Sequence, residues 1–391
     1  MVRRRSRVRF PPVALFLHAK LRRALESSAA NPVRPLKIEV RSCHSGCSAG
    51  STADEHMTDK ATQLEKRVRR IAAAAPCRMG VSVSLVGHGS VLELNSDRLF
   101  PLASVYKIPL IATLFHKIDS GKIDLEERIV LREEDKSLGS SDLQYLRPGL
   151  NMTLHDLCYE MIVHSDNTAT DMIHHRLGLD APNEYMRELG LDSLDIDCPC
   201  REYFLLFLGW ADRFKGVRLR QIGEIWKKMT HDQRIEAFTE IREQTRNRSS
   251  KEAQELGIQL WGYADEKETA EDRFASSVMD NHGSARDLTK LLDLIVTNKI
   301  ASAKNSEQMI AYMVLCDSRD RLPARIPPSV KVGNKTGTVP GTMNDCAIIY
   351  ASKKNTVCCT CLADNVKFSD KPAVAKKMAA VGLAVYETFR R

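Results

Sequence analysis

The sequence predicts a mixed α/β fold of the α+β type, in which helices flank an antiparallel sheet and an all-helical lobe is inserted between the segments that form that sheet. Three observations predict it. Apolar residues alternate with polar ones near both ends of the chain, helical periodicity dominates the middle, and the last segment is again helical. Because small-molecule sites tend to lie where two lobes meet, we expect a cleft between the sheet and the helical lobe.

The N-terminal part of the predicted sheet is a hairpin preceded by a helix. Residues 58–75 place Leu64 and Val68 at helical spacing, which predicts an amphipathic helix. Residues 80–86 alternate and lead through a Gly-His-Gly turn to a second apolar stretch at 91–94. This pattern is typical of a β-hairpin.

Helical periodicity continues through most of the middle of the chain. Thr153 is a predicted N-cap, because Asp156 three positions later completes an acidic version of the capping box. We expect one long charged helix over 219–247 and another helix over 284–297, whose first residue is a candidate N-cap.

After two consecutive prolines the hydrophobic period changes to two. Residues 330–334, 345–351 and 356–363 therefore predict three strands of one sheet, and residues 372–389 predict a closing helix. The sheet thus takes strands from both ends of the chain.

Charge separates an N-terminal extension from the rest of the chain. The net charge is +8, yet residues 1–56 hold 11 Lys and Arg against 4 Asp and Glu, whereas residues 57–391 hold 47 against 46. The extension has no sustained periodicity, so we expect it to be disordered or to be a non-native addition upstream of Met57. The folded part has no basic patch with interleaved aromatic residues, which argues against nucleic acid as a partner.

The folded part of the chain, residues 57–391, divides into two lobes. Residues 57–120 and 300–391 are expected to form the α/β lobe, and residues 121–299 the helical lobe. Within the latter, about 209–275 is a strongly charged insertion that contains all three tryptophans, so we expect it to be folded.

Cysteine usage and hydropathy exclude several classes of protein. Eleven cysteines cannot all pair within one chain, which argues against a disulfide scaffold. Cys198 and Cys200 do not have the spacing of a zinc hairpin, so we do not expect a zinc site there. The function predicted below involves no metal and no cofactor. No apolar run is long enough for a membrane helix, so we expect no integral membrane segment.

Three short motifs follow one another along the chain. They are Ser104-Val-Tyr-Lys107, Ser165-Asp-Asn167 and Lys335-Thr-Gly337. Together they match the S-x-x-K, S-D-N and K-T-G set of serine acyl-transfer enzymes. Ser104 is predicted to open an apolar helix that continues to about residue 117.

The motifs contain the groups that one acyl-transfer site needs. On a helix Lys107 lies one turn from Ser104 and can take its proton, provided that burial and a second cation lower the lysine pKa. Lys335 is the natural second cation. Ser165 can relay a proton, and backbone N–H groups after Gly337 can form an oxyanion hole.

The chain resembles the class A serine β-lactamases, over roughly residues 78–205 and 276–390. Besides the motifs, Phe100 precedes the nucleophile by four residues, and the stretch 335–347 is similar to the family's K-T-G strand, turn and next strand. The resemblance implies a β-lactamase-like two-lobe fold. It makes Ser104 the acylated nucleophile, Lys107 its base and Ser165 the proton relay.

The resemblance also implies the residues that bind substrate. Asn167 would bind the substrate amide, and Lys335, Thr336 and Thr338 would bind its carboxylate, with Gly337 in the same strand. The backbone N–H groups of Ser104 and Thr338 would form the oxyanion hole.

One expected residue fits the family pattern poorly. Class A enzymes use a glutamate after the S-D-N motif to activate the deacylating water, and Glu202 is the only carboxylate at the matching distance. However, Arg201 directly precedes it, no proline follows, and residues 203–208 are typical of a buried helix. Glu202 therefore has two interpretations, a deacylation base or a helix-start glutamate paired with Arg201.

The predicted function is that of a serine β-lactamase, which hydrolyses the β-lactam amide through an acyl-enzyme on Ser104. One alternative is a D,D-peptidase, penicillin-binding protein or esterase with slow deacylation. Another, of a different class, is a non-catalytic sensor of β-lactams or peptidoglycan fragments. The family implies a periplasmic or secreted location, but the chain has no convincing signal peptide, so a cytoplasmic location stays open.

Overall fold

The computed structural model describes residues 51–391 except 141, 254 and 256–267, with side chains from residue 58 onward. Helix α2 (Ser51–Ala73) begins before the expected start of the folded part, so residues 51–56 are helical and not disordered. The expectations for residues 1–50 and for Trp261 lie outside the described residues.

A five-stranded sheet is formed by both ends of the chain, as predicted. Its order is β2-β1-β9-β8-β7, and each neighbouring pair is antiparallel. The strands are β1 (Arg78–Leu85), β2 (Gly89–Leu94), β7 (Val332–Val339), β8 (Thr342–Tyr350) and β9 (Thr356–Asp364). The β1–β2 hairpin and the three C-terminal strands of the prediction are confirmed.

Strand β7 is longer than its sequence pattern indicated. The alternation predicted a strand over 330–334, whereas β7 continues through the K-T-G motif to Val339. Gly337 pairs with Asn344 in this continuation. The motif therefore lies within a hydrogen-bonded strand and not after its end, which gives its side chains a rigid support.

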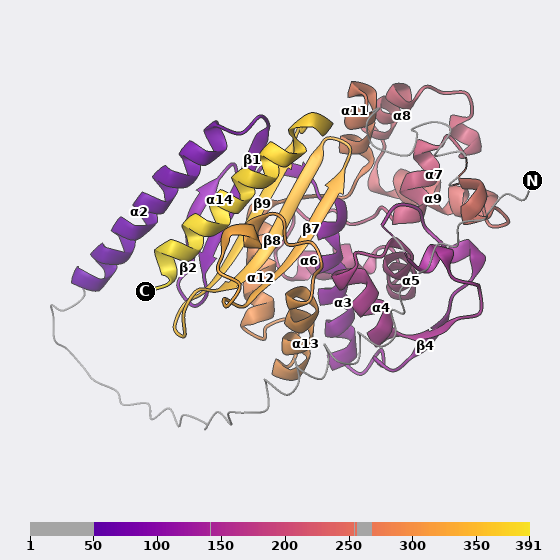
Figure 1. Ribbon diagram of the computed structural model, residues 1–391. Helices are drawn as coiled ribbons and strands as arrows, with labels where there is room; N and C mark the ends of the chain where they lie inside the picture. Colours follow the sequence, from indigo (N-terminus) through magenta and orange to yellow (C-terminus); the bar gives the residue numbers. More distant parts are fainter. Residues whose placement is uncertain (1–50, 141, 254, 256–267) are drawn as a thin grey trace, which may run out of the picture. The chain divides into compact units, whose positions relative to one another are not determined.

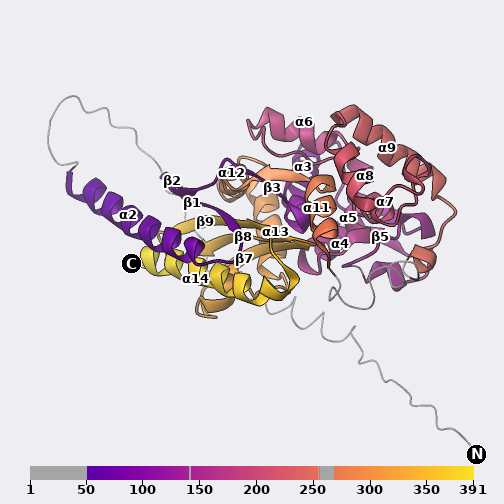
Figure 2. The ribbon, with the colours of Figure 1, turned by 90° about the horizontal axis from the view of Figure 1, so that it is seen from above.

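Helices cover both faces of the sheet. Figure 1 shows α2 and α14 (Lys371–Phe389) on one face, with α12 (Ala285–Val296) and α13 (Ala303–Val314) behind the sheet, and Figure 2 shows the same layers from above. Leu64 and Val68 of α2 share an apolar cluster with β1, β9 and α14. The α12 helix packs on β1 and β9, so the α/β lobe begins before residue 300, where the sequence had placed its boundary.

Helix α3 (Lys107–Asp119) packs mainly against other helices of the helical lobe, although the sequence had placed residues 57–120 in the α/β lobe. Its residues 107–115 are all buried. Thr153 caps α4 as predicted: its hydroxyl accepts a hydrogen bond from the Asp156 N–H, and the Thr153 N–H donates to the Asp156 carboxylate. The other helices of this lobe are α4 (Leu154–Val163), α5 (Asn167–Leu177), α6 (Ala181–Glu188) and α7 (Cys200–Phe207). A short pair, β4 (Arg128–Val130) and β5 (Asn151–Thr153), borders it.

The charged insertion is folded around an apolar cluster of its own. Trp226, Phe238 and Ile241 are buried in this cluster together with residues of α7. The single helix predicted over 219–247 is wrong, because two helices are present: α8 (Leu219–Trp226) and α9 (His231–Gln244). Thr230 starts the second one by accepting a hydrogen bond from the Gln233 N–H. A further helix, α11 (Ala270–Met279), leads back to the body.

The end of the insertion joins the segment that carries the first motif. Strand β6 (His282–Ser284) pairs with β3 (Leu99–Pro101), and the Leu102 N–H donates to the Asn281 carbonyl at 2.8 Å. Among the described residues, no helix has the length and apolar character needed to cross a membrane.

Candidate active site

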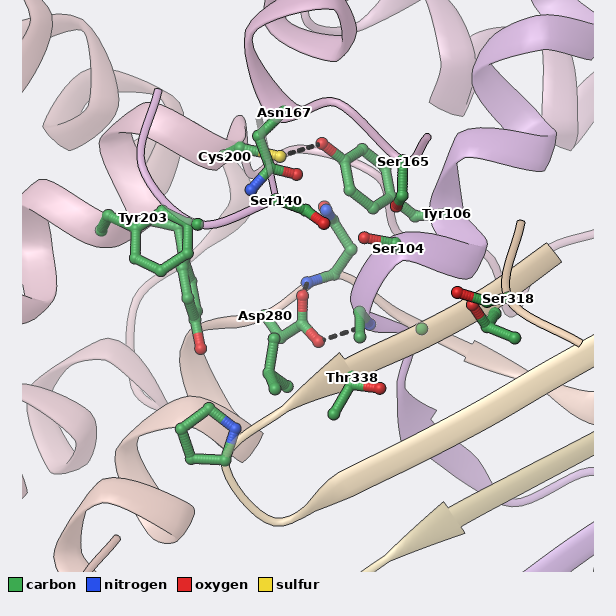
Figure 3. Close-up of a pocket in the computed structure, with 18 of the residues that line it drawn as sticks. Ser104, Tyr106, Ser140, Ser165, Asn167, Cys200, Tyr203, Asp280, Ser318 and Thr338 are labelled. Atoms are coloured by element: carbon green, nitrogen blue, oxygen red, sulfur yellow. Dashed lines mark hydrogen bonds between the residues drawn. The ribbon is translucent and has the colours of Figure 1, made fainter. Parts of the chain in front are cut away.

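A cleft of about 400 Å³ contains the three sequence motifs. It lies between strand β7, the start of α3, the start of α5 and the N-terminal part of α7 (Figure 3). The motif residues that line it are Ser104, Tyr106, Ser165, Asn167, Thr336 and Gly337, and Thr338 directly after the third motif also lines it. The structure thus brings together residues that the sequence separates by more than 200 positions.

The nucleophile candidate lies on a tight turn before α3. Residues Ala103–Tyr106 form a 3-10 helix, and the α-helix begins only at Lys107, which differs from the expected helix start at Ser104. Ala103 has a φ of 46°, in the left-handed region that non-glycine residues seldom occupy. Such backbone strain is found where the surrounding structure holds a functional group in place.

Ser165 lies between two buried lysines. Its Oγ is 3.2 Å from Lys107 Nζ and 2.9 Å from Lys335 Nζ. Lys107 Nζ also donates to the Ser165 carbonyl at 2.7 Å, and Ser165 has a φ of 58°, in the left-handed region. The arrangement gives a continuous path for a proton between the two amines.

Burial lowers the pKa of both amines. The pKa of Lys107 falls from its ordinary value because the ammonium is removed from water, although Asp166 and Asp171 act in the opposite direction. Burial, and then the charge of Lys107, lowers the pKa of Lys335 to about 7. A lysine is a base only when it is uncharged, so these shifts are in the direction that the sequence argument required.

Asn167 is fixed by bonds at both ends of its side-chain amide. Its Oδ1 accepts from Lys107 Nζ at 2.9 Å, and its Nδ2 donates to the Leu138 carbonyl at 2.7 Å. Asp166 caps α5 by accepting from the Ala169 N–H at 2.8 Å. The S-D-N motif therefore holds Ser165 next to a capped helix start.

Strand β7 approaches the nucleophile turn closely. A Cβ atom on Gly337 would lie 2.7 Å from the Leu102 carbonyl oxygen and 2.9 Å from the Ser104 nitrogen. Only glycine allows this approach. Thr336 and Thr338 flank it and line the cleft. The N–H groups of Ser104 and Thr338 stay predicted as the oxyanion hole.

Comparison with known proteins identifies the family. The model of the β-lactamase enzyme family matches residues 63–389. The chain belongs to this family.

Curated relatives agree with the assignment. The chain is 28% identical over 159 residues to a β-lactamase of Serratia marcescens, which is 39% of this chain and 51% of that protein. It is 30% identical over 135 residues to a β-lactamase of Rhodobacter capsulatus, which is 34% of this chain and 46% of that protein. The chain thus spans about half the length of the curated relatives that it matches.

Solved structures have the same fold. A β-lactamase from Sphaerobacter thermophilus has a TM-score of 0.59 at 23% identity and covers 83% of this chain and 96% of its own. A class A β-lactamase representative from Bacteroides cellulosilyticus has a TM-score of 0.61 at 18% identity, with 85% and 98% covered. The β-lactamase-like two-lobe fold predicted from the sequence is confirmed.

Arg321 is a residue of the β-lactamase-like cleft that sequence reasoning missed. Its Nη1 donates to the Gly337 carbonyl at 2.7 Å, and its Nη2 donates to Thr338 Oγ1. It therefore adds a positive charge beside the threonines that were predicted to bind a carboxylate. No motif contains it, so only the folded chain places it here.

Glu202 is not among the described residues that line the cleft. Its side chain is 1% exposed, and its carboxylate is 3.7 Å from the Arg242 guanidinium on the side of the insertion. The helix α7 begins two residues before it, so the interpretation of a buried helix start agrees with the structure. The predicted partner Arg201 instead donates to Thr245 Oγ1 at 2.9 Å. The geometry does not support Glu202 as the deacylation base.

Cys200 forms the cleft wall where a carboxylate had been expected. Its Sγ is 3.0 Å from the Tyr106 hydroxyl, as Figure 3 shows, and its N–H donates to Asp171 at 2.7 Å. Burial, and then the Asp171 charge, raises the pKa of the thiol. A neutral thiol cannot activate water as a carboxylate would.

Among the described residues, one cluster of three groups has ligand atoms close enough for a metal ion. It consists of Asp195, Asp197 and His231. The guanidinium of Arg234 already occupies it, with contacts of 2.7 Å to Asp195 and 3.0 Å to Asp197. This cluster is therefore an ion-pair network that attaches α9 to the segment before α7.

Proposed function

We propose that this chain is a serine hydrolase that opens β-lactam rings through an acyl-enzyme on Ser104. The observation that carries the proposal is the position of the Ser165 hydroxyl between Lys107 Nζ and Lys335 Nζ, in the cleft that Ser104 lines. Membership of the β-lactamase enzyme family supports the substrate class.

Acylation follows from this arrangement. Uncharged Lys107 takes the proton of Ser104, whose Oγ attacks the lactam carbonyl carbon. The C–N bond breaks, and the ring nitrogen receives a proton through Ser165. Because Ser165 also contacts Lys335 at 2.9 Å, it can be reprotonated from the second amine. Before the C–N bond breaks, the tetrahedral intermediate carries a negative charge on the former carbonyl oxygen, and backbone N–H groups would stabilise this charge.

The cleft offers a cationic end for the substrate carboxylate. Lys335 and Arg321 are both buried beside strand β7, and Thr336 and Thr338 line the space between them and solvent. A carboxylate that accepts hydrogen bonds from the threonines would hold the lactam carbonyl against Gly337.

A second candidate is a penicillin-binding activity with slow deacylation, and the position of Glu202 favours it. The acyl ester on Ser104 is released only when a base activates water, and the wall opposite strand β7 presents Cys200 and not this glutamate. Acylation would then be much faster than hydrolysis. A non-catalytic sensor, the third possibility raised by the sequence, would behave in the same way.

The experiment that tests the proposal is the time course of a chromogenic cephalosporin with the purified protein, with Ser104→Ala as control. Coloured product that exceeds one equivalent and is absent with the variant supports β-lactam hydrolysis. A burst of one equivalent, with a stable adduct of matching mass, supports the penicillin-binding candidate. Equal rates for both proteins, or no reaction with any β-lactam, would overturn the proposal.

A further inference from the structure

Asp280 is the carboxylate that lines the cleft. Of the described residues that form the cleft, it alone is acidic. Its Oδ2 accepts a hydrogen bond from the Ala103 N–H at 2.6 Å, and its Oδ1 accepts one from the Asn281 N–H at 2.9 Å. Figure 3 shows the first of these bonds below Ser104. The side chain is 8% exposed.

The bond to Ala103 acts on a strained residue next to the nucleophile. Ala103 has a φ of 46° and directly precedes Ser104. A residue that carries a Cβ seldom adopts this backbone conformation unless its surroundings stabilise it. The Asp280 carboxylate is the side-chain acceptor that binds the backbone of Ala103 in this conformation.

The same turn is held on its other side by the sheet. The Asn344 amide donates to the Leu102 carbonyl at 2.9 Å, and Gly337 lies against Leu102 and Ser104. The turn is therefore clamped between strand β7 and Asp280. Loss of either contact would leave the Ser104 hydroxyl with more than one orientation.

Asp280 is itself anchored at the base of the insertion. Its neighbour Asn281 accepts from the N–H groups of Asp197 and Cys198 at 2.9 and 2.8 Å, and it donates to the Cys198 carbonyl at 2.9 Å. The two ends of the inserted segment are thus fastened to each other. Asp280 connects this junction to the nucleophile turn.

Burial of Asp280 is unfavourable for a charged carboxyl group. It raises the pKa of this group to about 7, although the two N–H donors act in the opposite direction. A role in packing alone does not call for an acidic group in this position, since an apolar residue would avoid the desolvation.

We propose that Asp280 is a positioning residue of the acylation site, which holds Ala103 in its left-handed conformation and so sets the direction of the Ser104 hydroxyl and N–H. The proposal rests on the proposed function, because acylation is its first readout. It adds a residue that directly follows α11 to the machinery that the three motifs would form.

The test compares Asp280→Ala, Asp280→Asn and a matched control in the full chain. Asp287→Ala is the control, because Asp287 lies seven positions further on and accepts from Ser193 Oγ at 2.6 Å, away from the cleft. The measurements are the rate constant of acylation by the chromogenic cephalosporin, the apparent KM and the thermal unfolding midpoint. A second readout is the amide proton shift of Ala103 in protein labelled with 15N-alanine.

We expect acylation to slow by tenfold or more in Asp280→Ala, with less than a threefold change in apparent KM. Asp280→Asn keeps an oxygen acceptor for the Ala103 N–H and should stay within threefold of the wild-type rate. Asp287→Ala should lower the unfolding midpoint and leave the acylation rate unchanged. The Ala103 amide proton should move upfield only in Asp280→Ala.

An unchanged acylation rate in Asp280→Ala would overturn the proposal. The proposal would also be overturned if Asp280→Ala and Asp287→Ala lost the same share of the acylation rate, in proportion to the fall in their unfolding midpoints. Such a result would indicate that Asp280 has only a structural role. If the wild-type protein is not acylated by any β-lactam, the proposed function is wrong. The amide proton shift of Ala103 then tests separately whether Asp280 holds the backbone of Ala103. An unchanged shift in Asp280→Ala would then overturn the positioning role.

Discussion

The two walls of the cleft differ in how the chain forms them. The sheet wall combines β7 with the nucleophile turn: Gly337 lies against the backbone of Ser104, and Lys335 of the same strand donates to Ser165 Oγ. The helical wall combines the start of α7 with Asp280 and Asn281, which are held by contacts between distant segments. In the proposed reaction the sheet wall would carry the acylating groups, and Asp280 of the helical wall would position the turn that carries Ser104.

The largest effect is expected on the sheet wall, at Lys107. Lys107→Met removes the base and the donor to Ser165, so acylation should fall by about 10²–10⁴-fold. Stopped-flow measurement of the cephalosporin burst would check this, with circular dichroism to verify the fold. A burst within threefold of the wild type would show that another group takes the Ser104 proton.

The close approach of β7 gives the next largest effect. Gly337→Ala places a Cβ 2.7 Å from the Leu102 carbonyl, so we expect a loss of stability of about 1–3 kcal/mol. Acylation should fall at least tenfold, because the nucleophile turn must move. Gly333→Ala is the control. Gly333 lies on the same strand as Gly337 but does not line the cleft, and its added Cβ would lie 3.1 Å from the Met313 side chain of α13. Equal acylation rates in both variants would contradict the account.

The pH dependence of stability should have opposite signs in the two regions. Lys335 has a folded-state pKa of about 7, below its ordinary 10.5, so the unfolded chain binds more protons and stability rises with pH through this window. His231 of the insertion has a pKa raised from 6.5 to about 9, first by its bond to Asp197. Its stabilising effect is complete below pH 6.5 and is lost as the pH rises through 9.

Thermal unfolding of Lys335→Met and His231→Gln between pH 6.5 and 9 would measure this contrast. Relative to the wild type, Lys335→Met should gain most stability at the acidic end, and His231→Gln should lose most there. Both differences should shrink as the pH rises. A difference that grows with pH in either variant would contradict the assigned direction of that pKa shift.

The smallest effect is expected at Glu202. Because its carboxylate faces Arg242 and not the cleft, Glu202→Gln should change the rate of deacylation by less than threefold. The decay of the acyl-enzyme, followed by intact-protein mass spectrometry, gives this rate. Accumulation of adduct in the variant alone, with deacylation slowed by more than about tenfold, would restore this glutamate as the deacylation base.

The sequence predicted the sheet and the sheet wall because their signals are local. Alternation and the Gly-His-Gly turn predicted the β1–β2 hairpin, and the motif spacing predicted that Ser104, Lys107, Ser165 and Lys335 would meet. Each of these signals lies within a few residues and follows from backbone geometry or from one reaction's needs.

The sequence did not predict features that depend on tertiary contacts. The N-cap at Thr230 divides the expected long helix into two. Helix α12 packs on the sheet, but an apolar helix face alone does not indicate which element it will pack against. Arg321, Cys200 and Asp280 belong to no motif, and only folding places them at the cleft. The distance along the chain from the S-D-N motif suggested Glu202, but a distance in sequence does not give the direction of a side chain.

The most direct test of the central claim is the site of covalent modification. The protein would be incubated with benzylpenicillin, digested, and analysed by peptide mass spectrometry, in parallel with Lys107→Met. The account predicts one added acyl group on Ser104 in the wild type and a strongly reduced amount in the variant. Modification of another residue, such as Cys200, or equal labelling of Ser104 in both proteins, would contradict it.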